Sequence, residues 1–344
     1  MKLGVVLFNL GGPDSLDAVE PFLRNLFSDP AILPVPWPLR QWIARAIARR
    51  RAPVAQAIYA KLGGASPILA ETEAQARALE TALSRQGIIA RVFIAMGAAP
   101  PFSDAAAEAL VEWKPDRIAL LPLYPQYSTT TTDSAFAAWR RAAKRVNLQC
   151  PTGRVCCYPW DQGFVRAEAE LVQSALTARM SSVEYRVLFS AHGLPEYVVR
   201  RGDPYAWQVA RSVEAIVQAL GEHDLDWRLC FQSRVGPLKW LEPSTEAEIR
   251  QAGAEGKGLI VVPVAFVSEH SETLVELDLE YGEVARAAGS PHYLRVPTVG
   301  VGPSFIDGLA GLVLKAAGGD GSVNCGDGRI CPASFRACGY EGRA

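Results

Sequence analysis

The feature that most constrains the fold of this chain is a series of short, unbroken apolar runs. Each run is rich in Val, Ile or Leu and lacks the alternation of a strand with one solvated face. Runs of this kind predict strands that are covered on both faces, as in a parallel sheet flanked by helices. They span residues 4–10, 88–96, 117–124, 154–158, 185–190, 227–232 and 259–267.

Stretches of helical period separate these runs. In residues 67–86 the apolar side chains of Ile68, Ala76, Leu79 and Leu83 fall on one stripe, which is typical of a helix packed on a sheet. Alternating strands and helices predict an α/β fold with doubly wound, Rossmann-like parallel sheets. The other helical stretches are 104–113, 134–145, 164–179, 205–220 and 245–254.

The two halves of the chain repeat one pattern. Residues 6–13 (VLFNLGGP) resemble 187–195 (VLFSAHGLP), and 119–123 (ALLPL) resemble 260–264 (IVVPV). Two matched pairs in the same order predict an internal duplication. We expect two similar domains with a ligand cleft between them, beyond the carboxyl ends of the strands. The expected segments are a first α/β domain at 1–158, a second at 159–317 and a Cys-bearing tail at 318–344.

The first half carries an insertion at about 30–66. Residues 32–39 (ILPVPWPL) precede the segment 41–48 (QWIARAIA), which ends in Arg49-Arg50-Arg51. An apolar, Trp-bearing segment beside a basic run suits a surface that enters anionic lipid or holds a large apolar ligand. An ordinary core-facing helix with a solvated end is the alternative. We predict peripheral membrane contact through residues 32–51.

Charge and hydropathy exclude several classes of protein. The 35 basic and 36 acidic residues leave a net charge of −1, which argues against a nucleic-acid binder. No stretch approaches the roughly 18 apolar residues of a membrane span. The apolar run near the N-terminus stops at Asn9 and leads into a turn rather than a cleavage site. We therefore expect a cytoplasmic protein with reduced thiols, peripheral on the inner membrane.

The positions of the four histidines are informative. His192 directly follows a predicted strand, at the edge where an α/β sheet presents its ligand groups, and His270 follows another in the same way. An imidazole there accepts a proton near neutral pH. A histidine satisfied by a backbone partner is the alternative.

A row of carboxylates follows His270. Glu272, Glu276 and Glu280 recur at four-residue spacing, so a helix stacks them on one face. Like charges at this spacing repel unless they share protons or cations. The row therefore suits a proton relay or the passage of a divalent cation, and a solvated acidic face is the alternative.

Two polar stretches follow other predicted strands. Residues 124–132 (YPQYSTTTT) offer hydroxyl groups and amides at a helix start. Residues 232–237 (QSRVGP) precede Trp240, and an arginine with an indole can hold a carboxylate and cover a planar ring. Gly11-Gly12 lacks the glycine pattern of a dinucleotide site, so none is predicted.

Together these segments resemble the ferrochelatases, enzymes that insert ferrous iron into protoporphyrin. The resemblance follows the chain in order over almost its whole length, and the motifs are specific because they occur together. It implies a two-domain chelatase fold and the terminal step of haem synthesis. The matching segments are 10–13 (LGGP), 63–67 (GGASP), 123–128 (LYPQYS), 190–195 (SAHGLP), 232–237 (QSRVGP) and 266–281.

The resemblance also implies roles for individual residues. His192 and Glu272 are the implied catalytic pair. Either His192 removes protons from the pyrrole nitrogens or it binds the substrate Fe2+ with Glu272, and both roles stay open. Glu276, Glu280 and Glu269 correspond to an acidic row credited with proton removal or metal delivery. The porphyrin-binding positions are Leu10, Tyr124, Ser128, Trp240, Phe266 and His270.

One segment departs from the family pattern. Where many ferrochelatases have Arg-Tyr after a strand end, this chain has Gly97-Ala98. A cationic contact and an aromatic wall are therefore absent from the sequence there, which puts metal access or substrate retention at that edge in question. Our hypothesis is that Arg234 contacts the porphyrin propionates instead.

The tail concentrates three of the seven cysteines. Some ferrochelatases bind a [2Fe–2S] cluster through three C-terminal cysteines and one from the body, and the resemblance implies Cys325, Cys331 and Cys338 for the three. Thr129 stands where animal relatives have the fourth. Cys156 and Cys157 end a predicted strand, on the side of the sheet where Thr129 lies, whereas Cys150 precedes that strand. Of the first two we favour Cys157 as the fourth ligand, with Cys156 or Cys150 as the alternative. A zinc site or uncoordinated thiols are the alternatives.

Two other functional classes remain as hypotheses. A haem or metal carrier would use the same cleft without turnover, and an iron–sulfur sensor would use the tail cysteines. Coproporphyrin is an alternative to protoporphyrin as substrate. The sequence does not determine the oligomeric state, and a homodimer is compatible with it.

Overall fold

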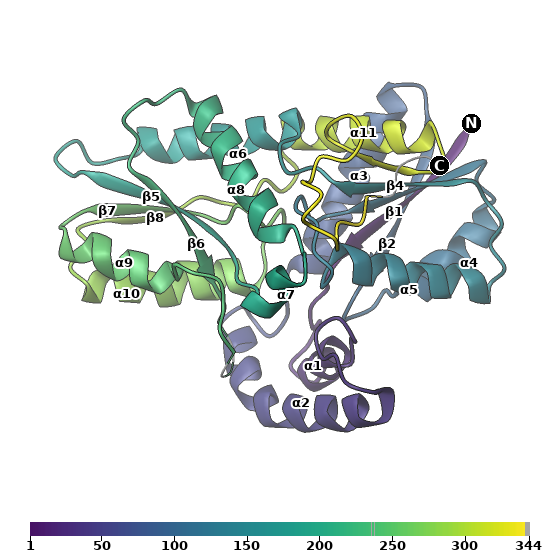
Figure 1. Ribbon diagram of the computed structural model, residues 1–344, viewed down its shortest axis with the longest axis horizontal. Coiled ribbons are helices and arrows are strands. Elements are labelled where there is room, and N and C mark those ends of the chain that lie inside the picture. The colour runs from purple at the N-terminus through teal and green to yellow at the C-terminus, as the bar shows by residue number, and fades with distance from the viewer. Residues whose placement is uncertain (235, 237, 341–344) are drawn as a thin grey trace. The chain divides into compact units, whose positions relative to one another are not determined.

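The computed structural model describes residues 1–234, 236 and 238–340, which form two compact units (Figure 1). Unit 1 contains Met1–Tyr158, Ile306–Pro332 and the segment that starts at Cys338. Unit 2 contains Pro159–Phe305 and Ala333–Ala337. Each unit is built on its own parallel sheet.

The sheet of unit 1 runs in the order β2-β1-β3-β4-β9, and all neighbouring strands are parallel. Side chains of β1 are buried on both faces, as the apolar run predicts. One face packs Val6 and Phe8 against Phe136 and Trp139. The strands are β1 (Lys2–Asn9), β2 (Ile89–Met96), β3 (Arg117–Pro122), β4 (Thr152–Cys157) and β9 (Ser322–Asn324).

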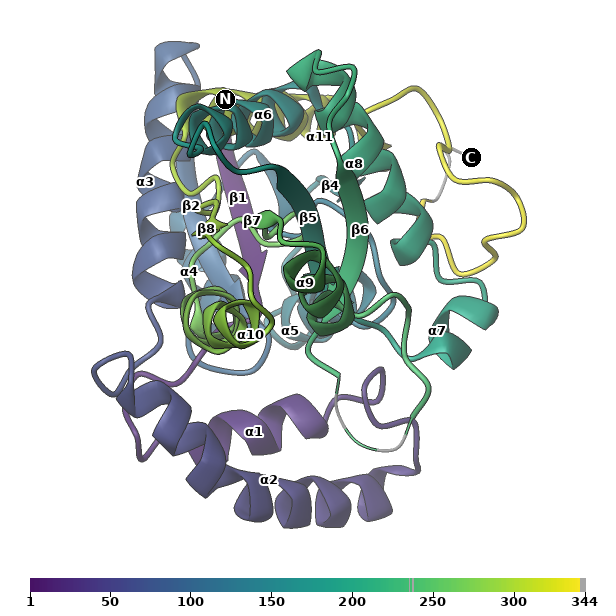
Figure 2. The same cartoon turned by 90° about the vertical axis from the view of Figure 1, so that its left-hand side faces the viewer.

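Helices cover this sheet. Figure 2 shows α3 beside β2, and α11 comes so close to β4 that a Cβ on Gly153 would lie 2.0 Å from the carbonyl oxygen of Ala316. Helices α1 and α2 pack on each other around Phe22, Ala48 and Tyr59. The helices are α1 (Val19–Phe27), α2 (Trp37–Ala60), α3 (Ile68–Arg85), α4 (Ser103–Trp113), α5 (Thr132–Arg145) and α11 (Pro303–Ala317).

The sheet of unit 2 runs in the order β6-β5-β7-β8, again all parallel. Helices α6 and α8 lie on one face, and α9 and α10 lie on the other (Figure 1). Its strands are β5 (Tyr185–His192), β6 (Trp227–Gln232), β7 (Gly258–Val262) and β8 (Tyr293–Arg295). Its helices are α6 (Gln162–Thr177), α7 (Glu196–Arg200), α8 (Tyr205–Leu220), α9 (Thr245–Ala254), the π-helix η1 (Glu272–Glu280) and α10 (Tyr281–Ala287).

Both sheets place their first strand between their second and third, with the fourth beyond the third. This confirms the prediction of two similar, doubly wound parallel sheets. The apolar run 259–267 gives a shorter strand, because β7 ends at Val262 and Pro263 follows, whose nitrogen cannot donate to a ladder.

The described C-terminal residues are divided between the two units. Strand β9 pairs with β4 of unit 1. The segment Ala333–Ala337 lies on unit 2, where the Ala337 amide donates to the Gly202 carbonyl at 3.1 Å and the Phe335 ring lies 5.8 Å from that of Trp207.

Candidate active site

His192 and Glu272 meet at the carboxyl end of β5. His192 is the last residue of that strand, and Glu272 is the first residue of η1. The Nδ1 atom of His192 lies 2.8 Å from Oε2 of Glu272, and the two side chains are 37% and 28% exposed. The structure therefore brings together the two residues that the resemblance implied as a pair, and both side chains are partly exposed to solvent.

Each partner changes the protonation of the other. Burial opposes the charged form of His192, but the adjacent Glu272 carboxylate outweighs it and raises the pKa of the imidazole. Burial also opposes the charged form of Glu272, yet the charge and hydrogen bond of His192 lower the pKa of this carboxyl to about 2. The arrangement favours an imidazolium–carboxylate pair that can release a proton and regain it.

The acidic row lies on a π-helix rather than on the regular helix that the four-residue spacing suggests. Helices of this kind are rare in proteins, and those that occur are often found at functional sites. Glu276 is the most constrained carboxylate of the row. Its Oε1 accepts from the Ser233 amide at 2.9 Å and from the Tyr281 hydroxyl at 3.0 Å, while its Oε2 accepts from the Ser233 hydroxyl and from Gln232 Nε2 at 3.1 Å.

Ser233 connects the first two carboxylates of the row. Its hydroxyl reaches Glu272 Oε2 at 3.3 Å as well as Glu276. Ser233 has a φ of +61°, a left-handed conformation that costs energy in a residue with a Cβ. Burial and the charge of Glu272 nevertheless raise the pKa of Glu276. Sequence reasoning quoted Ser233 only as part of a motif and gave it no role.

The other members of the row differ in their surroundings. Glu280 ends η1 and is exposed. Glu269 precedes η1 and accepts from Arg295 Nη1 at 2.6 Å and from the Thr298 amide at 3.0 Å. Glu269 therefore contacts β8 and the segment after it, rather than the carboxylates that follow it.

Aromatic side chains lie near His192. The ring of Phe266 lies 6.4 Å from His192 and 4.7 Å from His270. His270 is 7% exposed, and burial lowers the pKa of its imidazole, so this histidine stays neutral near pH 7. Trp240 pairs with Pro195 close to Gly193, where an added Cβ would lie 3.2 Å from the indole. Phe266, His270 and Trp240 thus accompany His192 within unit 2.

Comparison with known proteins identifies the family. The ferrochelatase family model matches residues 2–317. The chain belongs to the ferrochelatase family. Curated ferrochelatases from Phenylobacterium zucineum and Caulobacter vibrioides are 51% and 49% identical to it, and each alignment covers 98% of this chain and 98% or 97% of the relative. A ferrochelatase from Pelagibacter ubique is 47% identical, with 98% of both chains covered.

Solved structures agree on the fold of this ferrochelatase. SirB from Bacillus subtilis is 15% identical, with a TM-score of 0.52 over 92% of this chain and 96% of that one. The SirB structure from the subspecies spizizenii has a TM-score of 0.53 at 13% identity. At these identities the match shows the chelatase-like fold alone. The motif-based prediction of an enzyme that inserts iron into a porphyrin for haem synthesis is confirmed by the family.

The remaining predicted porphyrin residues of the ferrochelatase lie mostly in unit 1. Leu10 packs at the edge of the apolar cluster of α1 and α2, and Tyr124 and Ser128 follow β3, where Ser128 is 1% exposed. Burial raises the pKa of the Tyr124 phenol, which therefore stays protonated. Arg234, in unit 2, is exposed and donates to the Leu241 carbonyl at 3.1 Å.

The cysteines gather unevenly around β4. Cys157 is fully buried, and the pKa of its thiol is raised first by the hydrogen bond that it makes with Cys156, then by burial, and also by the neighbouring Cys325 and Cys331. Cys150 instead precedes β4, where its sulfur lies 3.5 Å from the Pro115 carbonyl. Within residues 1–234, 236 and 238–340, no group of three or more His, Cys, Asp or Glu side chains is arranged to hold a metal ion.

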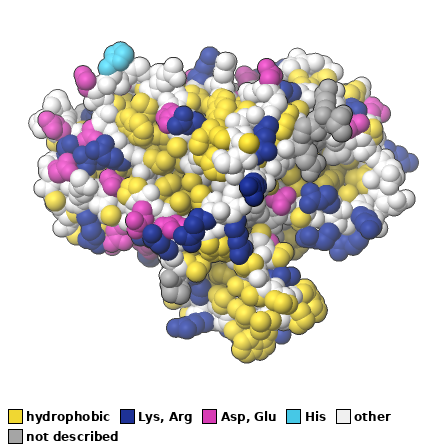
Figure 3. Space-filling view, viewed as in Figure 1, with side chains coloured by type: hydrophobic (Ala, Val, Ile, Leu, Met, Phe, Trp, Pro, Cys, Tyr) yellow, Lys and Arg dark blue, Asp and Glu magenta, His cyan; other side chains and the backbone are white. Residues whose placement is uncertain are grey.

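The insertion forms α2, which buries Ala48 and Tyr59 against α1 and exposes other apolar side chains. Trp37 and Trp42 are 68% and 70% exposed, and Figure 3 shows hydrophobic side chains gathered over α1 and α2. α2 therefore has one face packed on α1, as in an ordinary core-facing helix, and exposed tryptophans besides. In the described part of the chain, no helix is both long and apolar enough to span a bilayer.

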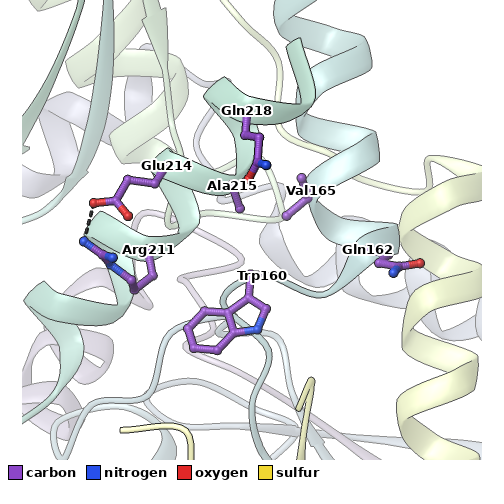
Figure 4. Close-up of a pocket in the computed structure, with 7 residues that line it drawn as sticks. All are labelled: Trp160, Gln162, Val165, Arg211, Glu214, Ala215 and Gln218. Atoms are coloured by element: carbon purple, nitrogen blue, oxygen red, sulfur yellow. Dashed lines mark hydrogen bonds and ion pairs between the residues drawn. The ribbon is translucent and has the colours of Figure 1, made fainter. Parts of the chain in front are cut away.

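A shallow pocket of about 370 Å³ lies between α6 and α8 in unit 2 (Figure 4). Trp160 forms one side, and an ion pair between Arg211 and Glu214 lies on the other. None of the residues that line it is among the predicted site residues, so the pocket is separate from the His192–Glu272 pair. Its lining residues are Trp160, Gln162, Val165, Arg211, Glu214, Ala215 and Gln218.

Proposed function

We propose that this ferrochelatase inserts Fe2+ into protoporphyrin IX to form protohaem, with His192 and Glu272 at the reacting centre. The observation that carries the proposal is the 2.8 Å contact between the imidazole and the carboxylate at the end of β5. Ferrous iron and the porphyrin are the substrates. Conversion requires two N–H protons to leave the porphyrin as one Fe2+ enters.

The geometry supports His192 as the group that removes those protons. With Nδ1 engaged by Glu272, Nε2 is the ring nitrogen available to substrate. A neutral imidazole accepts a pyrrole proton at Nε2, and the Glu272 carboxylate stabilises the resulting imidazolium. In the alternative, His192 and Glu272 bind the incoming Fe2+. The same two side chains would then act after the pyrrole protons have left.

We propose that protons leave this pair along the acidic row. The Ser233 hydroxyl bridges Glu272 and Glu276, so a proton that the imidazolium passes from Nδ1 to Glu272 can transfer to the serine oxygen while the serine proton transfers to Glu276. Exposed Glu280 would then return it to solvent. Glu269 also belongs to the proposed row, although its contacts with Arg295 and Thr298 favour a positioning role.

The porphyrin contacts are proposed from motif positions. Phe266 and Trp240 are apolar surfaces near His192 that can bend the macrocycle and expose its nitrogens. Arg234 is exposed and is proposed to contact a propionate. The other proposed porphyrin-binding residues are Leu10, Tyr124, Ser128 and His270.

The test of substrate identity is an anaerobic haem-formation assay with Fe2+ and either protoporphyrin IX or coproporphyrin III. The proposal expects a higher kcat/KM with protoporphyrin IX. A higher value with coproporphyrin III would overturn the substrate assignment and leave the reaction intact. Stoichiometric porphyrin or haem binding without turnover would favour a carrier.

We further propose that a [2Fe–2S] cluster binds Cys157, Cys325, Cys331 and Cys338. Four thiolates are the usual ligand set, and support comes from the proximity of Cys325 and Cys331 to buried Cys157. The described side chains are not arranged as a metal site, so binding requires the thiols to converge. When bound, the cluster would supply a redox-active group and a cross-link between the tail and β4.

Metal content and absorbance test this proposal. We expect two irons and two sulfides per chain and a visible absorption band, all lost in Cys157→Ser and retained in Cys150→Ser. Loss in Cys156→Ser alone would move the fourth ligand to Cys156. A colourless protein with one zinc per chain would contradict the cluster.

Finally, we propose that this cytoplasmic enzyme contacts the inner membrane through α2. Exposed Trp37 and Trp42 lie in the same helix as Arg49, Arg50 and Arg51, a combination that suits anionic lipid. Wild type should float with vesicles that contain phosphatidylglycerol, and Trp42→Gln should not. Val111→Gln, a matched change at an exposed apolar residue of α4, is the control and should float like wild type. Equal flotation of all three proteins would contradict membrane contact at this helix.

A further inference from the structure

Arg295 binds two acidic residues that stand on either side of the catalytic segment. Its Nε and Nη2 atoms donate to Asp278 Oδ1 and Oδ2 at 2.7 and 3.0 Å. Its Nη1 atom donates to Glu269 Oε1 at 2.6 Å. One guanidinium therefore joins positions 269 and 278, and between them lie His270, Glu272 and Glu276.

This contact is built into the interior of unit 2. The Arg295 side chain is 11% exposed, and Glu269 is 19% exposed. Burial opposes the charge of Glu269, but hydrogen bonds from Thr273, Arg295 and the Thr298 amide outweigh it and lower the pKa of this carboxyl. The bidentate contact is the one with Asp278, which is 34% exposed, and a bidentate pair fixes orientation more strictly than a single-point ion pair does.

A second residue of β8 reinforces the contact. Tyr293 and Arg295 are two positions apart, so their side chains point to the same face of the strand. The Tyr293 hydroxyl donates to the carbonyl of Leu277, next to Asp278. Strand β8 thus binds consecutive residues of η1.

The contacts from Tyr293 and Arg295 of β8 stabilise the π-helical form of η1. Its i→i+5 hydrogen bonds make it rare beside the ordinary i→i+4 helix. Rewinding the segment to an α-helix would turn Asp278 relative to Glu272, so both could not keep their present partners, Arg295 and His192. The contacts of Arg295 therefore match only the winding that places Glu272 against His192.

We propose that Arg295 is a positioning residue for metal insertion, which holds Glu269 and Asp278 so that Glu272 faces His192. The inference rests on the proposed function, because Glu272 and His192 are the groups that it positions. It adds no step to the reaction. Arg295 acts by increasing the fraction of molecules in which Glu272 faces His192.

Arg295→Lys tests the proposal, since lysine keeps the charge but cannot bind Asp278 in the bidentate way. We expect kcat to fall about 10- to 100-fold, because small displacements of reacting groups have effects of this size. The KM for protoporphyrin IX should stay within about threefold of wild type. Guanidinium added to Arg295→Ala should restore part of kcat, and methylammonium should not.

Arg186→Lys is the matched control. Arg186 is 3% exposed and binds Asp226 and Glu255 in the same unit, at the amino end of β5. This variant should lower Tm without lowering kcat at temperatures where it is folded. If Arg295→Lys does not fold, Asp278→Asn, which keeps the size of the side chain, must show the same loss of kcat.

The outcomes separate this inference from the function itself. Unchanged kcat in Arg295→Lys or Asp278→Asn, or a loss no greater than that in Arg186→Lys at equal folded fraction, would overturn the positioning role. Absence of haem formation by wild type would overturn the proposed function instead.

Discussion

His192 Nδ1 and Glu272 Oε2 are 2.8 Å apart, although 80 positions separate the two residues in the chain. The contact joins the end of a central strand to the first turn of a π-helix. It raises the pKa of the imidazole and lowers that of the carboxyl. A base whose proton affinity is increased by an adjacent anion suits the removal of weakly acidic pyrrole protons.

The first prediction concerns the pH dependence of Glu272→Gln. As the proposed base, His192 must be neutral, so activity should rise as pH passes the pKa of this imidazole, which Glu272 raises above 6.5. Removal of the anion should move this acidic limb to lower pH while kcat falls about 100-fold. Profiles of kcat against pH for both proteins test this, and a limb that stays fixed or moves upward would contradict it.

The same pair predicts a pH window for stability. The raised pKa of His192 contributes stability that is complete below 6.5 and is lost as pH rises through the folded value. The lowered pKa of Glu272 contributes stability that is complete above 4.5 and is lost as pH falls toward about 2. The difference in Tm between wild type and Glu272→Gln should therefore be largest between pH 4.5 and 6.5. A difference that is independent of pH would oppose the ion pair.

Ser233 offers a test that separates backbone from side chain. Both Ser233→Ala and Ser233→Gly remove the hydroxyl that bridges Glu272 and Glu276, so both should lower kcat by about tenfold or more. Only glycine relieves the left-handed φ of +61°, so Ser233→Gly should be more stable than Ser233→Ala by about 1 kcal/mol. Denaturant unfolding and steady-state rates measure the two effects. A wild-type rate in either variant would exclude the bridge.

Gly193 limits how closely β5 and β6 can approach beyond His192. A Cβ there would lie 2.9 Å from the Gln232 carbonyl oxygen, so Gly193→Ala should cost about 1–3 kcal/mol and displace His192. Gly311, in α11, has no atom within 4 Å of an added Cβ, and Gly311→Ala should stabilise by up to about 1 kcal/mol. Chemical denaturation of both variants tests the contrast, and equal effects would contradict it.

The fold was predictable where apolar pattern and local signals agree. The bounds of β6, α8 and α9 match the predicted segments 227–232, 205–220 and 245–254. The strand-end position of His192 followed from the apolar run that precedes it. Short strands such as β8 and β9 gave no comparable signal, because three residues are too few for a periodic pattern.

The sequence allowed us to predict the proposed catalytic residues of the site, but not the residues that hold them in place. His192 stood out at a strand end and Glu272 in a row of carboxylates, and the resemblance to ferrochelatases implied that the two form a pair. Four-residue spacing does not distinguish a π-helix from an α-helix, so the winding of η1 was not predicted. Ser233 and Arg295 act through contacts with residues 43 and 17 positions away, which a single sequence does not reveal.

The central claim is tested most directly by anaerobic haem formation from Fe2+ and protoporphyrin IX with wild type, His192→Ala and His223→Ala. His223 is an exposed histidine of unit 2 and serves as the matched control. The account predicts haem formation by wild type and by His223→Ala at similar rates, and a loss of about 100-fold or more in His192→Ala. A folded His192→Ala protein that forms haem at the wild-type rate would contradict it.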